Sequence, residues 1–98
     1  MKIIWSPLSL DRIVEISDFI AEDKPGASVK WVDSVFEEVE RLIKFPELGR
    51  KVPEINHRDT REILLGNYRI IYRIEEKSIN VLTVRHGKQM LSKKDLSK

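Results

Sequence analysis

Cysteine is absent from this chain, and histidine occurs only twice in its 98 residues. The lack of cysteine excludes a disulfide scaffold, a Cys-ligated zinc site and a thiol nucleophile. Two histidines are too few for a His-rich metal centre, so we expect neither a metal nor another cofactor. The absence of cysteine also agrees with a reducing compartment such as the cytoplasm.

Long apolar runs are missing as well. No stretch is long enough to cross a bilayer, and residues 1–12 lack the apolar core of a signal peptide, so we expect a cytoplasmic protein with no membrane partner. The chain is 41% apolar and 35% charged, which provides enough apolar material for one core and too much for a disordered chain. Chains of this length rarely hold two cores. We therefore expect a single domain over residues 1–98, with a flexible basic tail from about residue 90.

The formal net charge of +2 conceals an uneven distribution. Residues 1–48 hold 6 basic and 10 acidic side chains, a balance of −4, whereas residues 49–98 hold 12 basic and 6 acidic ones, a balance of +6. A basic half on a small domain indicates an acidic or polyanionic partner, although basic residues can also simply solvate one face.

The first half of the chain shows helical spacing after one short strand. Residues 2–5 are typical of a strand, and Ser6 followed by Pro7 predicts a helix start. Apolar residues then recur every three or four positions to about residue 22 and again from about 26 to 45, with a break at residues 23–26. This pattern predicts an antiparallel helical hairpin.

The second half changes to a period of two. Residues 50–60 have no clear period and are predicted to form a loop. Strands follow at 61–65, 68–74 and 79–86, and Gly66-Asn67 predicts a tight hairpin between the first two. The predicted order is β-α-α-β-β-β, an α+β fold in which the helical hairpin packs on one face of a small antiparallel sheet. Alternation places Tyr68, Ile70, Tyr72 and Ile74 towards the helices.

This pattern resembles the RelE/ParE superfamily of bacterial toxins from type II toxin–antitoxin pairs. The resemblance covers residues 4 to about 91 and rests on WSPLSLDRI, KPGA with WVDSV, FPELGR, REILLGNYRIIYRI and INVLTVRHGKQ. It implies the same order of elements and neutralisation by an antitoxin encoded alongside. The antitoxins of this superfamily wrap an extended or helical C-terminal segment over the toxin, which implies a toxin–antitoxin hetero-oligomer.

The superfamily holds two activities, and the resemblance favours the one associated with ParE. RelE-like members cut mRNA on the ribosome, whereas ParE-like members inhibit DNA gyrase without nuclease activity. The nuclease candidates in this sequence are Arg69, His86, Lys88 and Glu62. The set is incomplete, because Gln89 stands where an arginine is expected and no tyrosine or histidine follows His86. We therefore expect a non-enzymatic gyrase inhibitor, with a metal-independent ribosome-bound endoribonuclease as the alternative.

Five basic residues of the second half are candidates for partner binding, because arginine and lysine suit phosphate or an acidic antitoxin segment. They are Arg61, Arg69, Arg73, Arg85 and Lys88. The alternative for Arg69 and Arg73 is cross-strand ion pairing with Glu62 or Glu75. Strand alternation puts Glu62 and Arg61 on opposite faces unless a bulge intervenes. A further alternative is a decayed toxin that retains antitoxin binding alone.

Overall fold

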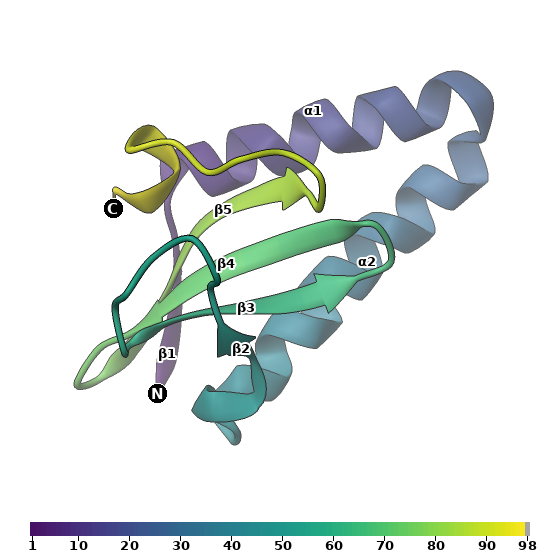
Figure 1. Cartoon of the computed structure of the whole chain (residues 1–98). Helices are drawn as coiled ribbons and strands as arrows, with labels where there is room; N and C mark the ends of the chain where they lie inside the picture. The colour runs from purple at the N-terminus through teal and green to yellow at the C-terminus, as the bar shows by residue number, and fades with distance from the viewer. Residues whose placement is uncertain (98) are drawn as a thin grey trace.

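Two antiparallel helices cover one face of a curved five-stranded sheet in the computed structural model, which describes residues 1–97 (Figure 1). The helices are α1 (Pro7–Asp23) and α2 (Pro25–Glu40). The strands are β1 (Lys2–Trp5), β2 (Arg50–Lys51), β3 (Thr60–Leu65), β4 (Tyr68–Ile74) and β5 (Ser78–His86). Three short 3₁₀ turns are η1 (Arg41–Ile43), η2 (Pro46–Leu48) and η3 (Lys94–Leu96). The α+β fold class and the order of the main elements predicted from the sequence are confirmed.

The sheet has the order β1-β5-β4-β3-β2 and is mixed rather than purely antiparallel. Strands β3, β4 and β5 form the predicted antiparallel meander, whereas β1 lies parallel to β5 at the edge. A second correction concerns residues 50–60, which were predicted to be a loop. The two residues of β2 pair with Glu62 and Arg61 of β3. A strand of two residues is too short to show an alternating pattern in the sequence.

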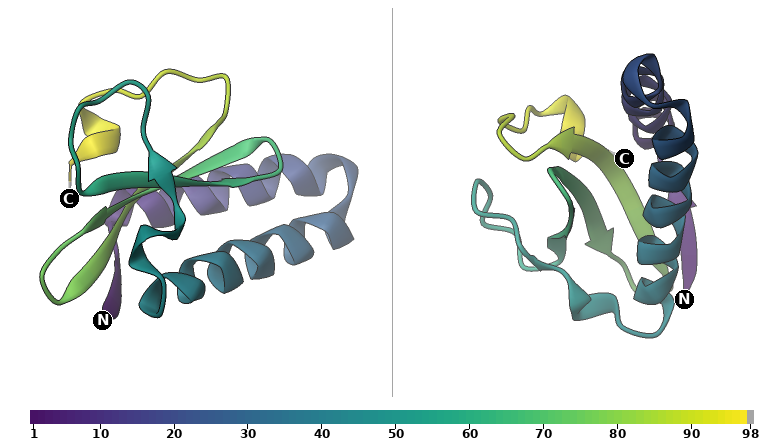
Figure 2. Two further views of the ribbon diagram at one scale, coloured as in Figure 1. Left: turned by 60° about the horizontal axis from the view of Figure 1, so that its bottom comes forward. Right: turned by 90° about the vertical axis from the view of Figure 1, so that its right-hand side faces the viewer.

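The helical hairpin begins as predicted and is tighter than predicted. The Ser6 hydroxyl accepts a hydrogen bond from the Ser9 amide at 3.0 Å, and Pro7 occupies the first turn of α1, where its missing N–H costs nothing. The connection is Lys24 alone instead of residues 23–26, since Pro25 starts α2 directly. Helix α2 ends at Glu40 rather than 45, and its pattern continues as the 3₁₀ turn η1. Figure 2 shows both helices in one layer against the sheet.

Apolar clusters lie on both faces of the sheet. The larger one is between sheet and helices, where Ile70 and Tyr72 of β4 are fully buried against residues such as Val35 and Leu42. The predicted helix-facing set of β4 is therefore confirmed. A smaller cluster of Val52, Ile71 and Leu82 lies on the outer face and is covered by Ile55, Leu91 and Leu96. Residues 91–96, expected to belong to a tail, thus pack against the sheet.

A β-bulge changes which residues of β5 face the helices. Ile71 of β4 is opposite Thr83, but the next residue, Tyr72, is opposite Val81, so Leu82 is the extra residue on β5. The inward-facing positions therefore shift from Val81 to Val84 on passing the bulge. As a result Arg85 points to the outer face, and His86 follows Val84 on the helix face.

Two glycines are required by backbone geometry. Gly66 has φ +59° and Asn67 does not have a positive φ, which fits a type II′ turn between β3 and β4. Gly49 has no room for a side chain, because a Cβ there would lie 2.6 Å from the Glu62 carbonyl oxygen and 2.7 Å from the Tyr72 hydroxyl. That hydroxyl accepts from the Gly49 amide at 2.9 Å and donates to the Pro46 carbonyl at 2.7 Å. Tyr72 therefore fastens the FPELGR segment to the core through two hydrogen bonds.

Candidate functional site: the arginine cluster and the groove beside β5

Arg69 is the centre of a buried ion-pair cluster on the outer face. Its side chain is 6% exposed. Its Nε donates to Glu62 Oε1 at 2.7 Å, and its two Nη atoms donate to the two Glu54 carboxylate oxygens at 2.7 Å each. The other Glu62 oxygen accepts from Arg50 Nε at 2.7 Å. A fifth contact joins Arg69 Nη1 to the Gln89 carbonyl at 3.3 Å.

This arrangement corrects the expectation that Arg69 is an available surface cation. The cross-strand pairing with Glu62, the alternative drawn from the sequence, is present, and the second partner is Glu54. The hydrogen bonds from Arg69 hold the pKa of Glu54 below its usual value of 4.5, and both carboxylates raise the pKa of Arg69 further above its usual range. The cluster fastens the loop that carries Glu54 and the turn at Gln89 to the middle of the sheet.

His86 lies on the opposite face of the sheet from this cluster. Its ring contacts the Tyr68 ring edge-on, with the centroids 5.5 Å apart. Its Nδ1 accepts a hydrogen bond from the Lys88 amide at 3.2 Å, which places the proton of the neutral ring on Nε2. The His86 amide donates to Gln89 Oε1 at 3.1 Å. His86 therefore organises the turn that follows β5.

The remaining predicted cations are mostly engaged within the chain. Arg61 lies on the helix face and donates to the Gly49 carbonyl at 2.9 Å, so the sequence-based separation of Arg61 from Glu62 holds. Arg73 Nε donates to Thr60 Oγ1 at 2.9 Å, and Arg85 has an ion pair described below. Among the five predicted partner-binding residues, Lys88 alone is exposed. The structure brings Arg69 and Arg85 together as cross-strand neighbours on the outer face.

Asp95 is a functional candidate that sequence reasoning missed. It is fully buried and accepts hydrogen bonds from Thr83 Oγ1 at 3.0 Å, the Ser92 amide at 2.9 Å and Ser92 Oγ at 3.0 Å. Arg85 Nε lies 3.5 Å and Arg12 Nη2 3.7 Å from its oxygens. Burial alone would raise the pKa of Asp95, but the bonds from Ser92 and Thr83 and the Arg85 charge bring it below 3.8. The S-x-x-D spacing of residues 92–95 was the available signal, since it is the pattern of a local side-chain cap.

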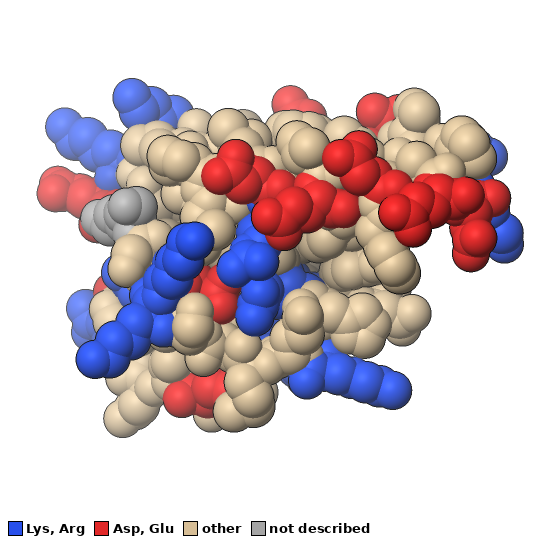
Figure 3. Space-filling model, turned by 90° about the horizontal axis from the view of Figure 1, so that it is seen from above, with Lys and Arg blue, Asp and Glu red and all other residues tan. Residues whose placement is uncertain are grey.

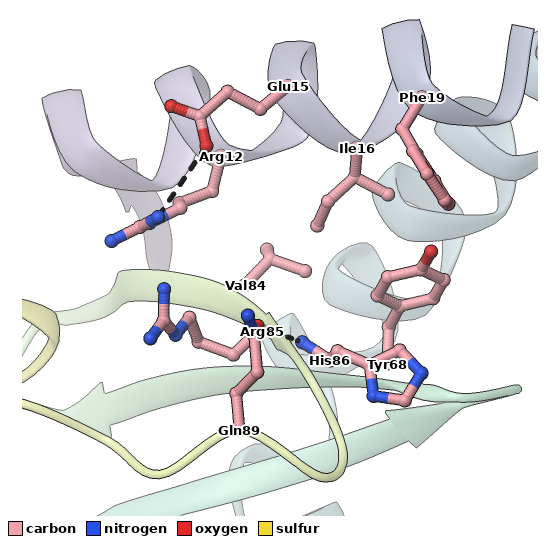
Figure 4. Close-up of a pocket in the computed structure, with 9 residues that line it drawn as sticks. All are labelled: Arg12, Glu15, Ile16, Phe19, Tyr68, Val84, Arg85, His86 and Gln89. Carbon is pink, nitrogen blue, oxygen red and sulfur yellow. Dashed lines mark hydrogen bonds and ion pairs between the residues drawn. The ribbon is translucent and has the colours of Figure 1, made fainter. Parts of the chain in front are cut away.

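A groove of about 420 Å³ lies between α1 and the end of β5 (Figure 4). From α1, Arg12, Glu15, Ile16 and Phe19 point into it. The sheet and the following turn contribute the other lining residues, which are Tyr68, Val84, Arg85, His86 and Gln89. The groove thus joins an apolar wall to two arginines.

The surface on the α1 side of the molecule is divided by charge. Seen from the α1 side, acidic side chains form a row beside a group of basic ones (Figure 3). Helix α1 carries four exposed acidic residues spaced four, three and four positions apart, which puts them on one helical face. They are Asp11, Glu15, Asp18 and Glu22. Among residues 1–97, no three histidine or carboxylate side chains come together in a way that would hold a metal ion, and no helix is long and apolar enough to span a bilayer.

Comparison with known proteins identifies the class. The family described as "ParE toxin of type II toxin-antitoxin system, parDE" matches residues 3–91. A curated sequence named "Putative toxin Y4kP", from Sinorhizobium fredii (strain NBRC 101917 / NGR234), is 33% identical over 90 residues, which cover 90% of each chain. A solved structure titled "Chromosomal ParDE TA system from P. aeruginosa" has the same fold, with a TM-score of 0.76 over 88% of this chain and 95% of that one at 20% identity.

The fold and the matches therefore define a toxin of the RelE/ParE superfamily. The chain belongs to the family of ParE toxins of type II toxin–antitoxin systems. Membership in this family implies an antitoxin partner.

Proposed function

We propose that this ParE-family toxin arrests growth by binding DNA gyrase in the cytoplasm, without bond chemistry of its own, and that a cognate antitoxin neutralises it in a toxin–antitoxin hetero-oligomer. Family membership supports the antitoxin. The observation that favours gyrase over RNA is the separation of the groups that RNA cleavage would need.

Metal-free RNA cleavage needs a proton acceptor, a proton donor and cations converging on one phosphate. His86 projects from the helix face of β5, whereas Glu62 and Arg69 lie on the outer face. Glu62 is 1% exposed and already pairs with two arginines, so a substrate hydroxyl cannot reach it without opening the ion-pair cluster. Arg69 is likewise neutralised by ion pairs with the Glu54 and Glu62 carboxylates. This arrangement supports a protein-binding toxin.

Two assays on one preparation test the proposal. Purified protein is added to DNA gyrase in a supercoiling assay and to an in vitro translation reaction whose mRNA ends are mapped. We expect dose-dependent loss of supercoiling and no new mRNA ends. Codon-positioned cuts that disappear in His86→Ala or Glu62→Ala would contradict the proposal and favour a ribosome-dependent endoribonuclease of RelE type.

The antitoxin part of the proposal has its own support in the charge distribution. The balance of +6 over residues 49–98 favours an antitoxin whose C-terminal segment is net acidic. On the outer face Arg69 is engaged by Glu54 and Glu62, and the apolar cluster beside it is covered by Ile55, Leu91 and Leu96. We therefore propose the α1–β5 groove and the neighbouring surface of the helical hairpin as the interface. Co-expression of the antitoxin should restore growth, and its binding should raise the melting temperature. An affinity that does not change with salt would contradict the electrostatic part.

A further inference from the structure

The two edges of the sheet differ in how well they are protected against pairing with another chain. At one edge lies β2, whose two residues, Arg50 and Lys51, are both basic and exposed. Short length and positive charge are common means of keeping a strand edge unpaired. At the other edge lies β1, and of its four residues Lys2–Trp5 only the first is charged. The β1 edge is therefore the less protected of the two.

The pairing of β1 with β5 shows which backbone groups of β1 are free. The Lys2 amide donates at 3.3 Å to the carbonyl of the residue before β5, and the Ser6 amide donates at 3.0 Å to the Val81 carbonyl of β5. Backbone groups alternate in direction along a strand, so Ile3 and Trp5 turn their N–H and C=O groups away from β5. Among residues 1–97, no strand lies on that side and no backbone hydrogen bond reaches these four groups.

Exposed apolar side chains flank this free edge on both faces of the sheet. Ile3 and Trp5 pack on the main core cluster, so Ile4 points to the outer face, where it is 40% exposed. On the helix face the Trp5 ring packs against the ring of Phe36 of α2, with the centroids 4.7 Å apart, and Phe36 is 42% exposed. An open strand edge between exposed apolar side chains is a surface that suits another strand.

We propose that a second copy of this chain binds at this edge, so that the two β1 strands pair antiparallel about a two-fold axis at Ile4 and the two sheets become one. In this register Ile3 of one copy and Trp5 of the other form a hydrogen-bonded pair on each side of the axis. The four hydrogen bonds use every free backbone group of the edge. The two Ile4 side chains meet as a non-hydrogen-bonded pair, in which side chains lie closest. This dimer goes beyond the proposed function and does not depend on it.

A second copy is favoured over an unrelated peptide because the edge is complementary to itself. Its donors and acceptors are placed symmetrically about Ile4, as a two-fold interface requires. The two Lys2 residues lie on opposite sides of the axis, about 14 Å apart along the strands, which is more than the Debye length of about 8 Å at physiological ionic strength. Their repulsion is therefore weak. The paired edge is short, so we expect a reversible dimer whose population depends on concentration. The residues that line the α1–β5 groove do not include β1, so the dimer leaves that groove open.

Sedimentation of the purified toxin at concentrations from about 1 µM to 1 mM tests for the dimer. We expect the average mass to rise from that of a monomer towards that of a dimer. Ile4→Lys should weaken association at least tenfold, because it places two like charges at the axis. Leu64→Lys is the matched control, since it adds the same charge at an exposed (52%) residue of β3, and it should change association less than twofold. A wild type that stays monomeric, or equal effects of the two substitutions, would overturn the proposal.

Amide hydrogen exchange on the wild-type toxin tests the register without any substitution. As the concentration rises, the Ile3 and Trp5 amides should exchange at least tenfold more slowly, whereas the Ile4 amide, which turns to β5, should change less than twofold. A dimer that forms without this alternation uses another surface and contradicts the proposal. Protection of Ile3 and Trp5 that appears only after an antitoxin is added would assign the edge to the antitoxin and would also overturn it.

Discussion

The two faces of the sheet are stabilised by different chemistry. The helix face is a hydrocarbon layer in which Ile70, Tyr72 and Val84 meet the helical hairpin. The outer face has only a small apolar cluster, and next to it the Glu54–Arg69–Glu62–Arg50 ion pairs fasten a loop to the strands. The helix face can tolerate conservative changes of shape, whereas the outer face depends on charges that must all be matched. The arginine of the YRIIYR strand is therefore part of the architecture.

The largest effect is expected from removing that arginine. Arg69→Ala leaves the Glu54 and Glu62 carboxylates facing each other without their shared cation, and breaking a buried pair in this way costs about 3–5 kcal/mol. Urea unfolding should show the loss, and growth inhibition should fall with it because less folded toxin is present. Strand alternation alone predicts that Arg69→Ala is stably folded and less toxic. A variant that keeps the stability of the wild type would therefore support a surface, partner-binding role for Arg69.

A substitution at the contact between Gly49 and Tyr72 should lower the free energy of unfolding by less than Arg69→Ala does. Gly49→Ala forces a Cβ to within 2.7 Å of the Tyr72 hydroxyl and closer still to the Glu62 carbonyl, and such overpacking costs about 1–3 kcal/mol. Gly26→Ala is the matched control, because a Cβ there meets nothing within 4 Å and alanine favours a helix by about 0.5–1 kcal/mol. Thermal unfolding of both variants should give shifts of opposite sign.

Acid should weaken the outer face before it affects the helix face. The pKa values of Glu54 and Asp95 are held below 4.5 and 3.8 in the folded chain. A carboxylate with a lowered folded pKa stabilises the fold above its unfolded pKa, and this stability is lost as the pH falls through the folded value. The free energy of unfolding should therefore be flat near neutrality and decline below about pH 4.5. Asp95→Asn should make that decline shallower, and an unchanged slope would remove Asp95 from the account.

The smallest effect on stability is expected at Lys88. This residue is exposed, and surface substitutions away from special features usually change stability by less than about 0.5 kcal/mol. Lys88→Ala should keep the melting temperature and lower the salt dependence of antitoxin or gyrase binding. If Lys88→Ala binds with the same affinity as the wild type at every ionic strength, Lys88 is not part of the interface.

Sequence patterns predicted the architecture well because they report directly on burial. The period of β4 identified its helix-facing residues, and Ser6-Pro7 and Gly66-Asn67 marked a helix start and a hairpin turn. The parallel placement of β1 left no local signal, since pairing with β5 joins residues more than 70 positions apart.

The candidate site was harder to predict from the sequence, because it too depends on contacts between residues that are far apart in the chain. The pairing of Arg69 with Glu62 could be predicted because the two residues lie on neighbouring strands. The pairing with Glu54 could not, because residues 50–60 have no periodic pattern that would place Glu54 relative to the sheet. The bulge at Leu82 decides which face each residue beyond it takes, so that Arg85 lies on the outer face and His86 on the helix face. This bulge has no composition signal in the run INVLTVRH. The groove itself depends on where β1 stops and on how α1 crosses β5, which are properties of the packed chain.

The most direct test of the account is a double-mutant cycle between Arg69 and Glu54, measured by urea unfolding of the wild type, Arg69→Ala, Glu54→Ala and the double variant. Groups in one buried ion-pair network interact by about 0.5–3 kcal/mol. We expect a coupling energy in the upper half of that range, with most of the cost of Arg69→Ala removed when Glu54 is absent as well. A coupling near zero, with every variant folded and Arg69→Ala non-toxic, would show that Arg69 is a surface contact for a partner and would contradict the comparison of the two faces.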